Sequence, residues 1–356
     1  MQFRDLYTGA PRDQTLAVDA SMQSLFDLDY GAEQGALVDL YAKGKARQWD
    51  AEARIDWSLE LDPDNPQQLP ELLFPLTGFA AYEKASASMR ADMRRHHQAW
   101  MTSQFLHGEQ GALLCAAKIV QSVPGMDAKL YAATQAVDEA RHVEAYRRLQ
   151  AKFGIAYPIT DTLSTLVEQV LADRRWDMTY LGMQVVIEGL ALAAFAGIRD
   201  YAQNPLARQV NAYVMEDEAR HVAFGRLALR EIYPQLLASE RREREDFLIE
   251  ACHLMRERFF AAEVWRHFGL PLDACRAFIQ DSPTMANFRT RLFSRIVPVV
   301  RDIGLMGPRV AQAFEAMGVR DFAAIDLAAV AADDEAHAAA IDARRAHITA
   351  VAGLAE

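Results

Sequence analysis

The sequence predicts an all-α fold: a four-helix bundle with additional N- and C-terminal helices. Long stretches have helical character, and nowhere do four to eight alternating apolar and polar residues indicate a strand. The chain also contains an internal repeat, in which a Glu inside an apolar run is followed thirty residues later by Asp-Glu-Ala-Arg-His. A turn signal, Pro-Gly in one copy and Asn-Pro in the other, lies near the middle of each repeat, as expected for two helical hairpins.

The N-terminal part, residues 1–77, is expected to form an arm with two short helices that packs over the bundle. Its charges are mixed, its helical character is weak over 22–57, and 62–66 is rich in turn residues. The pattern becomes strongly helical at about residue 78 and remains so to 123. We expect a break within 89–95, because this length is too great for one straight helix around a small core.

The bundle is expected to occupy 78–234 and a C-terminal helical cover 235–356, within one compact domain. Gly154 and Pro158 end the second bundle helix. The next helices are predicted at 161–172, from about 176 to 203 in the third bundle helix, and up to Tyr233-Pro234 in the fourth. The cover should begin with a charged helix at 239–268, followed by shorter helices separated by prolines.

The two copies of the repeat are offset by 79 residues. Glu109 precedes Glu139 in the first copy, as Glu188 precedes Glu218 in the second. A helix rises about 1.5 Å per residue, so equal counts out to the turn and back return the chain to the same level. Glu109 should therefore face Glu139, and Glu188 should face Glu218.

Each second helix adds a histidine three residues after its Glu, His142 after Glu139 and His221 after Glu218. This spacing places each Glu and His on one helix face. Counting along each helix in heptad register places the four Glu and two His residues on the helix faces that point into the bundle core. Gln135 and Val214 lie on the same faces.

Four carboxylates buried together without compensation would cost several kcal/mol each. Two divalent cations would supply four positive charges. The alternative is a pair of salt-bridged hairpins, but Arg141 and Arg220 lie two residues after a Glu, and so point about 200° away from it around the helix. Metal binding is therefore the favoured interpretation.

At these residues the sequence resembles the ferritin-like di-iron carboxylate proteins, over roughly residues 91–232. In that family one Glu from each of two helices and Glu-x-x-His from each of the other two hold two metal ions. The resemblance implies two irons, with Mn/Fe as an alternative, held by Glu109, Glu139, His142, Glu188, Glu218 and His221. It also implies that Asp138 and Asp217 orient a histidine on the opposite Glu-x-x-His helix.

This resemblance favours an oxygenase that uses O2 to hydroxylate, N-oxygenate or desaturate a small, partly apolar substrate. An alternative is a radical protein like the ribonucleotide reductase small subunit, since Tyr146 occupies the position of that family's radical tyrosine. That family usually has Asp at the position of Glu109 and a tyrosine near its C-terminus, whereas the last tyrosine here is Tyr233. A metal store or catalase-like bundle is the third alternative, but such chains are usually much shorter.

Further comparisons concern single positions. Bacterial multicomponent monooxygenases and acyl-carrier-protein desaturases carry a Thr one turn beyond the third ligand, where this chain has Ala191 and Leu192. Arylamine N-oxygenases carry an extra His ligand where this chain has Val214, so we expect six ligands. The residues predicted to face a substrate pocket, each of which also fits an ordinary core position, are Phe105, Ala112, Leu113, Ala116, Leu192 and Phe195.

The net charge of −11 argues against a nucleic-acid partner. Three cysteines without a C-x-x-C pair indicate neither an iron–sulfur site nor a disulfide framework, so we expect a cytoplasmic protein. The sequence has neither a signal-peptide core nor a run of 18 apolar residues, so no membrane segment is predicted.

The sequence also lacks a dinucleotide-binding fingerprint, so electrons should come from an external ferredoxin or flavin reductase. A homodimer is left open.

A second Asp/Glu/His group occurs near the C-terminus, at 333–337. Asp334 and His337 are three residues apart and share a helix face. The flanking alanines predict an ordinary surface helix with acids at its start, and we do not expect a ligand pair there.

Overall fold

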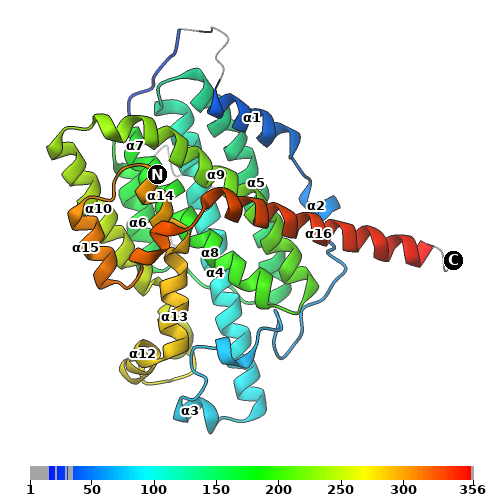
Figure 1. Cartoon of the computed structure of the whole chain (residues 1–356). Helices are drawn as coiled ribbons and strands as arrows, with labels where there is room; N and C mark the ends of the chain where they lie inside the picture. Colours follow the sequence, from blue (N-terminus) through cyan, green and yellow to red (C-terminus); the bar gives the residue numbers. More distant parts are fainter. Residues whose placement is uncertain (1–15, 21, 29, 31–34, 354–356) are drawn as a thin grey trace, which may run out of the picture.

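Four long helices form the centre of the computed structural model (Figure 1), which describes residues 16–20, 22–28, 30 and 35–353. They make two antiparallel hairpins, and no strand occurs in the described part of the chain. The bundle helices are α4 (Ala87–Ser122), α5 (Met126–Phe153), α8 (Glu188–Tyr201) and α9 (Pro205–Ile232). The predicted all-α bundle is confirmed.

The bundle helices begin and end at the turn residues that were identified in the sequence. Gly125 has φ 88° between α4 and α5, and Gly154 ends α5 in the left-handed conformation that glycine adopts without strain. Asn204 caps α9 by accepting from the backbone nitrogens of Leu206 and Ala207, with Pro205 in the first turn.

The expected break within 89–95 is wrong, because α4 is continuous over 36 residues. The break lies earlier, between α3 (Ala80–Glu83) and α4. Ser86 fixes it by accepting a hydrogen bond from the backbone nitrogen of Met89 at 3.1 Å. A long straight helix is tolerated because further helices cover both of its halves.

The third bundle helix follows α7 (Trp176–Thr179) and the π-helical segment η4 (Tyr180–Ile187), and then continues as α8. Gly182 in η4 lies so close to α6 (Asp161–Ala172) that a Cβ there would collide with Val170. Helix Trp176–Tyr201 is long and apolar enough to span a membrane by length and composition, with 78% of the tested window buried inside the protein.

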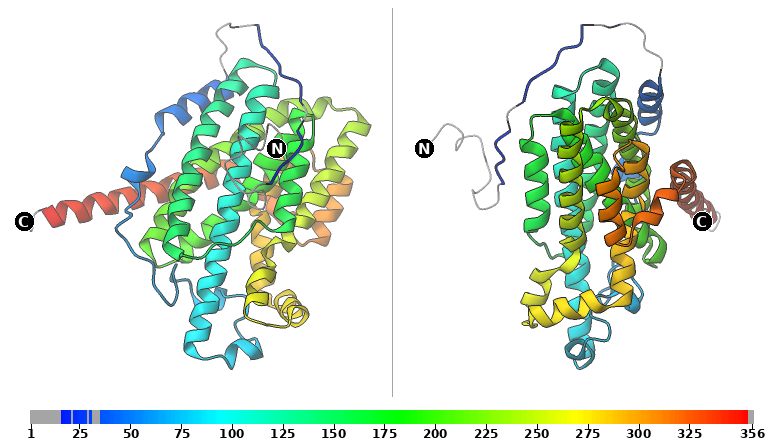
Figure 2. Two further views of the ribbon diagram at one scale, coloured as in Figure 1. Left: turned by 180° about the vertical axis from the view of Figure 1, so that it is seen from behind. Right: turned by 60° about the vertical axis from the view of Figure 1, so that its left-hand side comes forward.

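The remaining helices cover the bundle on several sides (Figure 2). On the N-terminal side they are α1 (Ala36–Ala46), α2 (Ala51–Arg54) and η3 (Glu71–Leu73). On the C-terminal side they are η5 (Tyr233–Gln235), α10 (Ala238–Glu257), η6 (Arg258–Phe260), α11 (Ala262–His267), α12 (Leu272–Asp281), α13 (Pro283–Arg291), η7 (Leu292–Ser294), α14 (Ile296–Asp302), α15 (Pro308–Ala316), η8 (Arg320–Ala324) and α16 (Leu327–Gly353).

The single helix predicted at 239–268 is also wrong, since the chain turns between α10 and α11. Phe259 leaves helical geometry, and Ala261 adopts φ 55°. The positive φ redirects the chain so that Trp265 can bury itself completely in the core. At this bend Arg258, directly after α10, donates to the backbone oxygen of Gln104 in α4 at 3.3 Å.

Candidate metal centre

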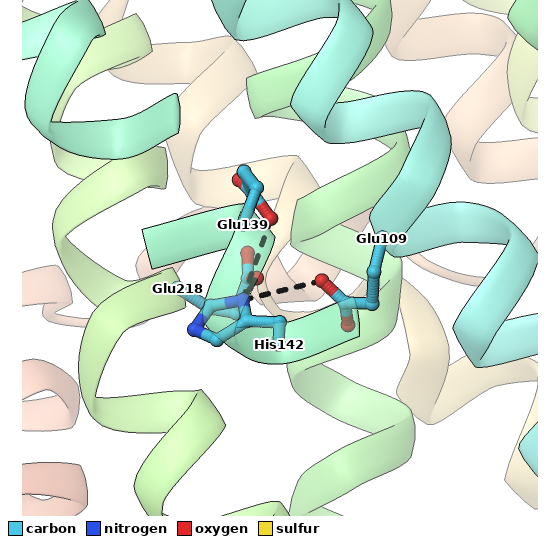
Figure 3. A group of neighbouring side chains, drawn as sticks. All are labelled: Glu109, Glu139, His142 and Glu218. Carbon is cyan, nitrogen blue, oxygen red and sulfur yellow. Dashed lines mark hydrogen bonds and ion pairs between the residues drawn. The ribbon is translucent and has the colours of Figure 1, made fainter. Parts of the chain in front are cut away.

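Six side chains from α4, α5, α8 and α9 meet inside the bundle, and all are buried. They form two groups whose potential ligand atoms lie within 4.8 Å of one another. The first group is Glu109, Glu139, His142 and Glu218, shown in Figure 3; the second is Glu139, Glu188, Glu218 and His221. Glu139 and Glu218 belong to both groups, so the two groups adjoin.

Both histidines turn Nδ1 inward. Nδ1 of His142 lies 3.2 Å from Glu109 Oε2 and 3.0 Å from Glu218 Oε1. Nδ1 of His221 lies 3.0 Å from Glu139 Oε1 and 3.5 Å from Glu218 Oε2. Each histidine therefore faces carboxylates of both hairpins.

Crowding of carboxylates in a buried space shifts their pKa values. Burial, and then the neighbouring Glu218, raise the pKa of Glu109 to about 8. Burial also raises the pKa of Glu188 well above its usual value, with Glu218 and Glu139 adding to the shift. Burial opposes protonation of His142, yet hydrogen bonds to Asp217 and Glu109 raise its pKa well above the ordinary value. The polypeptide alone does not neutralise this cluster without taking up protons.

Several inward atoms lack any hydrogen-bond partner within the described residues. Among those residues, Oε2 of Glu188 has neither a hydrogen-bond nor an ion-pair contact, while Oε2 of Glu139, Oε2 of Glu218 and Nδ1 of His221 have only ion-pair contacts without hydrogen-bond geometry. Orphaned buried polar atoms are rare in folded proteins unless another species satisfies them. Carboxylate oxygens with imidazole nitrogens are a donor set suited to iron or manganese. The residues present thus fit a pair of such metal ions.

The outward nitrogens of the two histidines contact the aspartates of the repeat. Nε2 of His142 lies 3.0 Å from Asp217 Oδ2, and Nε2 of His221 lies 3.2 Å from Asp138 Oδ2. Arg141 donates to both aspartates, at 2.8 Å to Asp217. Each aspartate therefore joins one hairpin to the other and directs a histidine Nδ1 toward the centre.

Two residues of the N-terminal arm complete this outer layer and were missed by the sequence analysis. Gln48 donates to Asp138 Oδ1 at 2.7 Å, and Trp49 donates from its indole nitrogen to Asp217 Oδ2 at 2.8 Å. Both residues lie in the connection between α1 and α2. No motif marks them in the sequence, because their partners are 90 and 168 residues away.

A known protein family matches most of this chain, including the residues of the metal centre. A family model described as p-aminobenzoate N-oxygenase AurF matches residues 31–304, which is more than half of the chain. The chain belongs to this family.

One solved structure shares the fold of this AurF-family chain. A mutant of R2-like ligand-binding oxidase with an anaerobically reconstituted Mn/Fe cofactor matches at 16% identity and a TM-score of 0.50, covering 77% of this chain and 95% of that one. Another structure of R2-like ligand-binding oxidase, with aerobically reconstituted metal cofactor after photoconversion, matches at 17% identity and a TM-score of 0.47, covering 81% and 93%. No curated protein matches. Family and fold together make the chain a ferritin-like di-iron carboxylate oxygenase with a dimetal site.

The chain departs from the arylamine N-oxygenase pattern at Val214, which is buried and apolar. Its counterpart in the other hairpin, 79 residues earlier, is the fully buried Gln135. Gln135 donates to Glu139 Oε1 at 3.1 Å and to Glu188 Oε1 at 2.9 Å. The two halves of the site are therefore unequal in a way that the sequence analysis did not identify.

Tyr146 lies beside the metal centre, and its hydroxyl has no carboxylate partner in the part of the chain that the structure describes. Its hydroxyl donates to Asn211 Oδ1 at 3.1 Å, and its ring packs against Phe105 and Phe195. Burial, followed by the charges of Glu109 and Glu218, raises the pKa of Tyr146 well above the ordinary value. The tyrosine is thus a neutral wall residue with a satisfied hydroxyl.

The C-terminal group differs from the expected surface helix. Asp334 is fully buried and accepts hydrogen bonds from Arg199 at 2.8 Å and from Arg295 at 3.0 Å. These bonds connect α16 to the rest of the protein. His337 is largely exposed, and its Nδ1 lies 2.9 Å from the backbone oxygen of Asp333. Asp334 is therefore a buried structural residue paired with two arginines, and not the surface acid that the sequence predicts.

Proposed function

We propose that the six clustered residues hold two iron ions and that the protein uses O2 to N-oxygenate an aromatic amine. The observation that carries this proposal is the pair of adjoining ligand groups sharing Glu139 and Glu218 in a chain of the AurF family. Two irons bound there would supply the electrons that reduce O2. Mn/Fe is the alternative composition.

The residues of the site would have different roles. Glu139 and Glu218 belong to both ligand groups and would help to hold both ions, whereas Glu109 and Glu188 each belong to one group. Asp138 and Asp217 hold the histidines in orientation. Ala191 and Leu192 occupy the place of the monooxygenase threonine, so α8 offers no hydroxyl there for moving protons.

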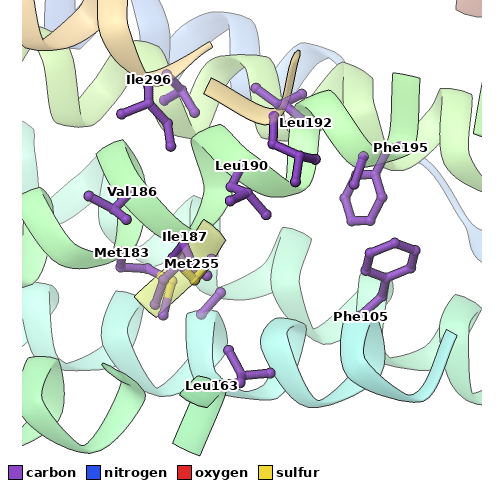
Figure 4. Close-up of a cluster of buried hydrophobic side chains, with 14 of the residues drawn as sticks. Phe105, Leu163, Met183, Val186, Ile187, Leu190, Leu192, Phe195, Met255 and Ile296 are labelled. Carbon is purple, nitrogen blue, oxygen red and sulfur yellow. The ribbon is translucent and has the colours of Figure 1, made fainter. Parts of the chain in front are cut away.

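An apolar wall keeps bulk water from the site. Phe105, Leu192 and Phe195 are buried in the cluster that Figure 4 shows beside α8. A dry wall protects a reactive oxidant from hydrolysis and side reactions. We also propose that electrons come from an external ferredoxin or flavin reductase, since no dinucleotide-binding fingerprint occurs in the sequence.

The reaction can be tested with full-length protein loaded with Fe(II), mixed with O2 and p-aminobenzoate, and analysed by mass spectrometry. We expect an N-hydroxylated or further N-oxygenated product that incorporates 18O from 18O2. Glu139→Ala should give none. Products hydroxylated only on carbon would contradict N-oxygenation, and iron accumulation or peroxide breakdown without an organic product would favour a store or catalase-like protein.

The radical alternative concerns Tyr146, which is buried close to the candidate ligands. If the protein is an oxygenase, the oxidising equivalents reach the substrate, and no long-lived tyrosyl signal should accumulate in electron paramagnetic resonance after reaction with O2. A persistent signal that disappears in Tyr146→Phe would establish the radical alternative.

We further propose a cytoplasmic location. The three cysteines are unpaired and buried, which suits a reducing compartment. A homodimer remains the alternative to a monomer, and sedimentation of the purified protein distinguishes the two.

A further inference from the structure

Four polar side chains continue from the metal centre toward the turn between α4 and α5. We call them the polar column; they are Tyr131 and Gln135 on α5, and Tyr180 and Gln184 on η4. On α5, Gln135 lies four residues before the candidate ligand Glu139. On η4, Gln184 lies four residues before Glu188. Each tyrosine lies four residues before its glutamine, so both helices carry the spacing Tyr-x-x-x-Gln-x-x-x-Glu on the face that holds the ligand.

Helix α9 brings the two halves of the polar column together. A Cβ added at Gly225 would lie 2.6 Å from Cβ of Gln184 and 3.7 Å from Cδ1 of Tyr180, so glycine is needed for this close approach. The ring of Phe224 lies 4.9 Å from that of Tyr180 and 4.4 Å from that of Tyr131, measured between centroids. Residues of α5 and η4 therefore meet above the ligands of α9.

Most polar atoms of the column are buried without partners. Among the described residues, no hydrogen-bond partner occurs for the hydroxyls of Tyr131 and Tyr180 or for either polar atom of Gln184. All four side chains of the column are 0% exposed. Leaving a buried polar group unpaired destabilises a protein, and such groups are rare unless water or another species satisfies them. The column ends at the metal centre, where Gln135 donates to Glu188 at 2.9 Å.

The internal repeat shows that this polarity is confined to one side of the metal centre. The residues that correspond to the column under the 79-residue offset are Val210 for Tyr131, Val214 for Gln135, Met101 for Tyr180 and Phe105 for Gln184. All four are apolar and buried. Phe105 packs against Tyr146 and Phe195, which follow the ligands on α5 and α8 and so lie on the side opposite the column (Figure 4). The centre therefore has one apolar side and one polar side, and duplication of the hairpin does not account for the polar residues.

The outer end of the column approaches the surface at α7. The ring of Tyr180 meets that of Trp176 edge to face at 5.6 Å. Trp176 is half-buried, and Arg174 shortly before it is exposed. The eight residues from Tyr180 to Glu188 span on the order of 10 Å along the helix. Segment η4 is also π-helical, a rare geometry that occurs frequently at functional sites.

Oxygenation of an amine requires a supply of protons. An amine, O2, two electrons and two protons give a hydroxylamine and one water molecule: the O–O bond breaks, one oxygen atom bonds to nitrogen and the other leaves as water. The electrons come from the external reductase, and the protons must come from bulk solvent. The apolar side of the centre excludes water, and Ala191 and Leu192 leave α8 without a hydroxyl beside the ligands.

We propose that the polar column binds a file of water molecules and conducts protons from the surface at α7 to the metal centre. The amide of Gln184 can both donate to water and accept from it, and the tyrosine hydroxyls can do the same. Gln135 connects the file to the candidate ligands. The inference rests on the proposed oxygenase function, which requires these protons.

The variant Gln184→Leu removes two unpaired polar atoms from the middle of the column. Full-length protein loaded with Fe(II) is mixed rapidly with O2 in H2O and in D2O, and the oxidation of iron is followed by absorbance. We expect oxidation to be at least about tenfold slower than in wild type, with a larger solvent isotope effect, because proton transfer becomes rate-limiting. Tyr180→Phe should act in the same direction and serves as the second variant if Gln184→Leu does not fold.

Thr179→Val is the matched control. The hydroxyl of Thr179 is also buried without a partner among the described residues, but Thr179 is not a member of the column. This variant should leave the rate and the isotope effect unchanged. Neither Thr179→Val nor Gln184→Leu should lower the melting temperature, since replacing an unpaired buried polar group by an apolar one is nearly neutral or stabilising. Unchanged kinetics in folded Gln184→Leu and Tyr180→Phe, or equal slowing in Thr179→Val, would overturn the proposal.

A crystal structure of the iron-loaded protein gives a readout that requires no turnover. Ordered water should lie about 2.7–3.2 Å from the amide of Gln184 and the hydroxyl of Tyr180, and Gln184→Leu should lose it. A wild-type column whose polar groups contact only protein atoms would contradict the proposal. N-oxygenation at the wild-type rate in Gln184→Leu would refute this inference alone. Iron oxidation that depends on Gln184 but yields no N-oxygenated product would refute the proposed function alone.

Discussion

Gln135 donates a hydrogen bond from its amide nitrogen to Oε1 of Glu188 at 2.9 Å. The same amide reaches Glu139, so one buried side chain restrains two candidate ligands from different hairpins. Its equivalent in the other hairpin, Val214, makes no such bond. Gln135 therefore distinguishes the two metal positions.

The variant Gln135→Leu should retain the fold but weaken binding of Fe(II) about tenfold, because outer hydrogen bonds fix the ligand carboxylates. Mössbauer spectra should show a larger change at the iron bound by Glu188 than at the other. Val214→Ala, which truncates the equivalent position without removing a hydrogen bond, is the control. Identical spectra of Gln135→Leu and wild type would show that Gln135 only fills space.

Asp217→Asn and Asp138→Asn should each weaken metal binding roughly 10- to 100-fold while the protein still folds. Asp217 accepts from His142, Arg141 and Trp49, so the neutral amide leaves the histidine less firmly oriented. Titration with Co(II), followed by its visible absorption, measures the affinity. Unchanged affinity in both variants would remove the aspartates from the metal centre.

Trp49→Phe tests whether the N-terminal arm supports the site. The variant removes the donor to Asp217, and we expect a loss of about 1 kcal/mol in the free energy of unfolding and a several-fold weaker metal affinity. Trp57→Phe is the matched control, because Trp57 donates to a backbone oxygen within the arm. It should reduce stability without changing metal affinity; equal effects on affinity would argue against a specific role for Trp49.

The pKa shifts predict how the metal-free protein responds to pH. Glu109, with a pKa of about 8, binds a proton in the folded state that the unfolded state releases near its ordinary pKa, so the free energy of unfolding falls as pH rises toward 8. The raised pKa of His142 acts in the same direction, since its stabilisation is lost as pH rises through the folded value. Metal-free protein should therefore melt at a lower temperature at pH 8 than at pH 6. Metal-loaded protein should show a smaller difference, because metal binding has already displaced these protons.

The site was more predictable than its surroundings. Glu109 and Glu139 could be placed opposite each other because the spacing about the Pro-Gly turn is local and regular. The contacts of Gln48 and Trp49, and the burial of Asp334, depend on how distant segments dock, which no periodicity records. The turn at Ala261 was also missed, because a positive φ at alanine is set by the burial of Trp265 and not by local preference.

The metal content of the purified protein tests the central claim most directly. Protein produced with iron should contain close to two iron atoms per chain by elemental analysis. Because Glu139 and Glu218 belong to both ligand groups, Glu139→Ala or Glu218→Ala should lose most of both ions. A folded, active wild-type protein without metal, or a Glu139→Ala variant that retains two irons, would contradict the account.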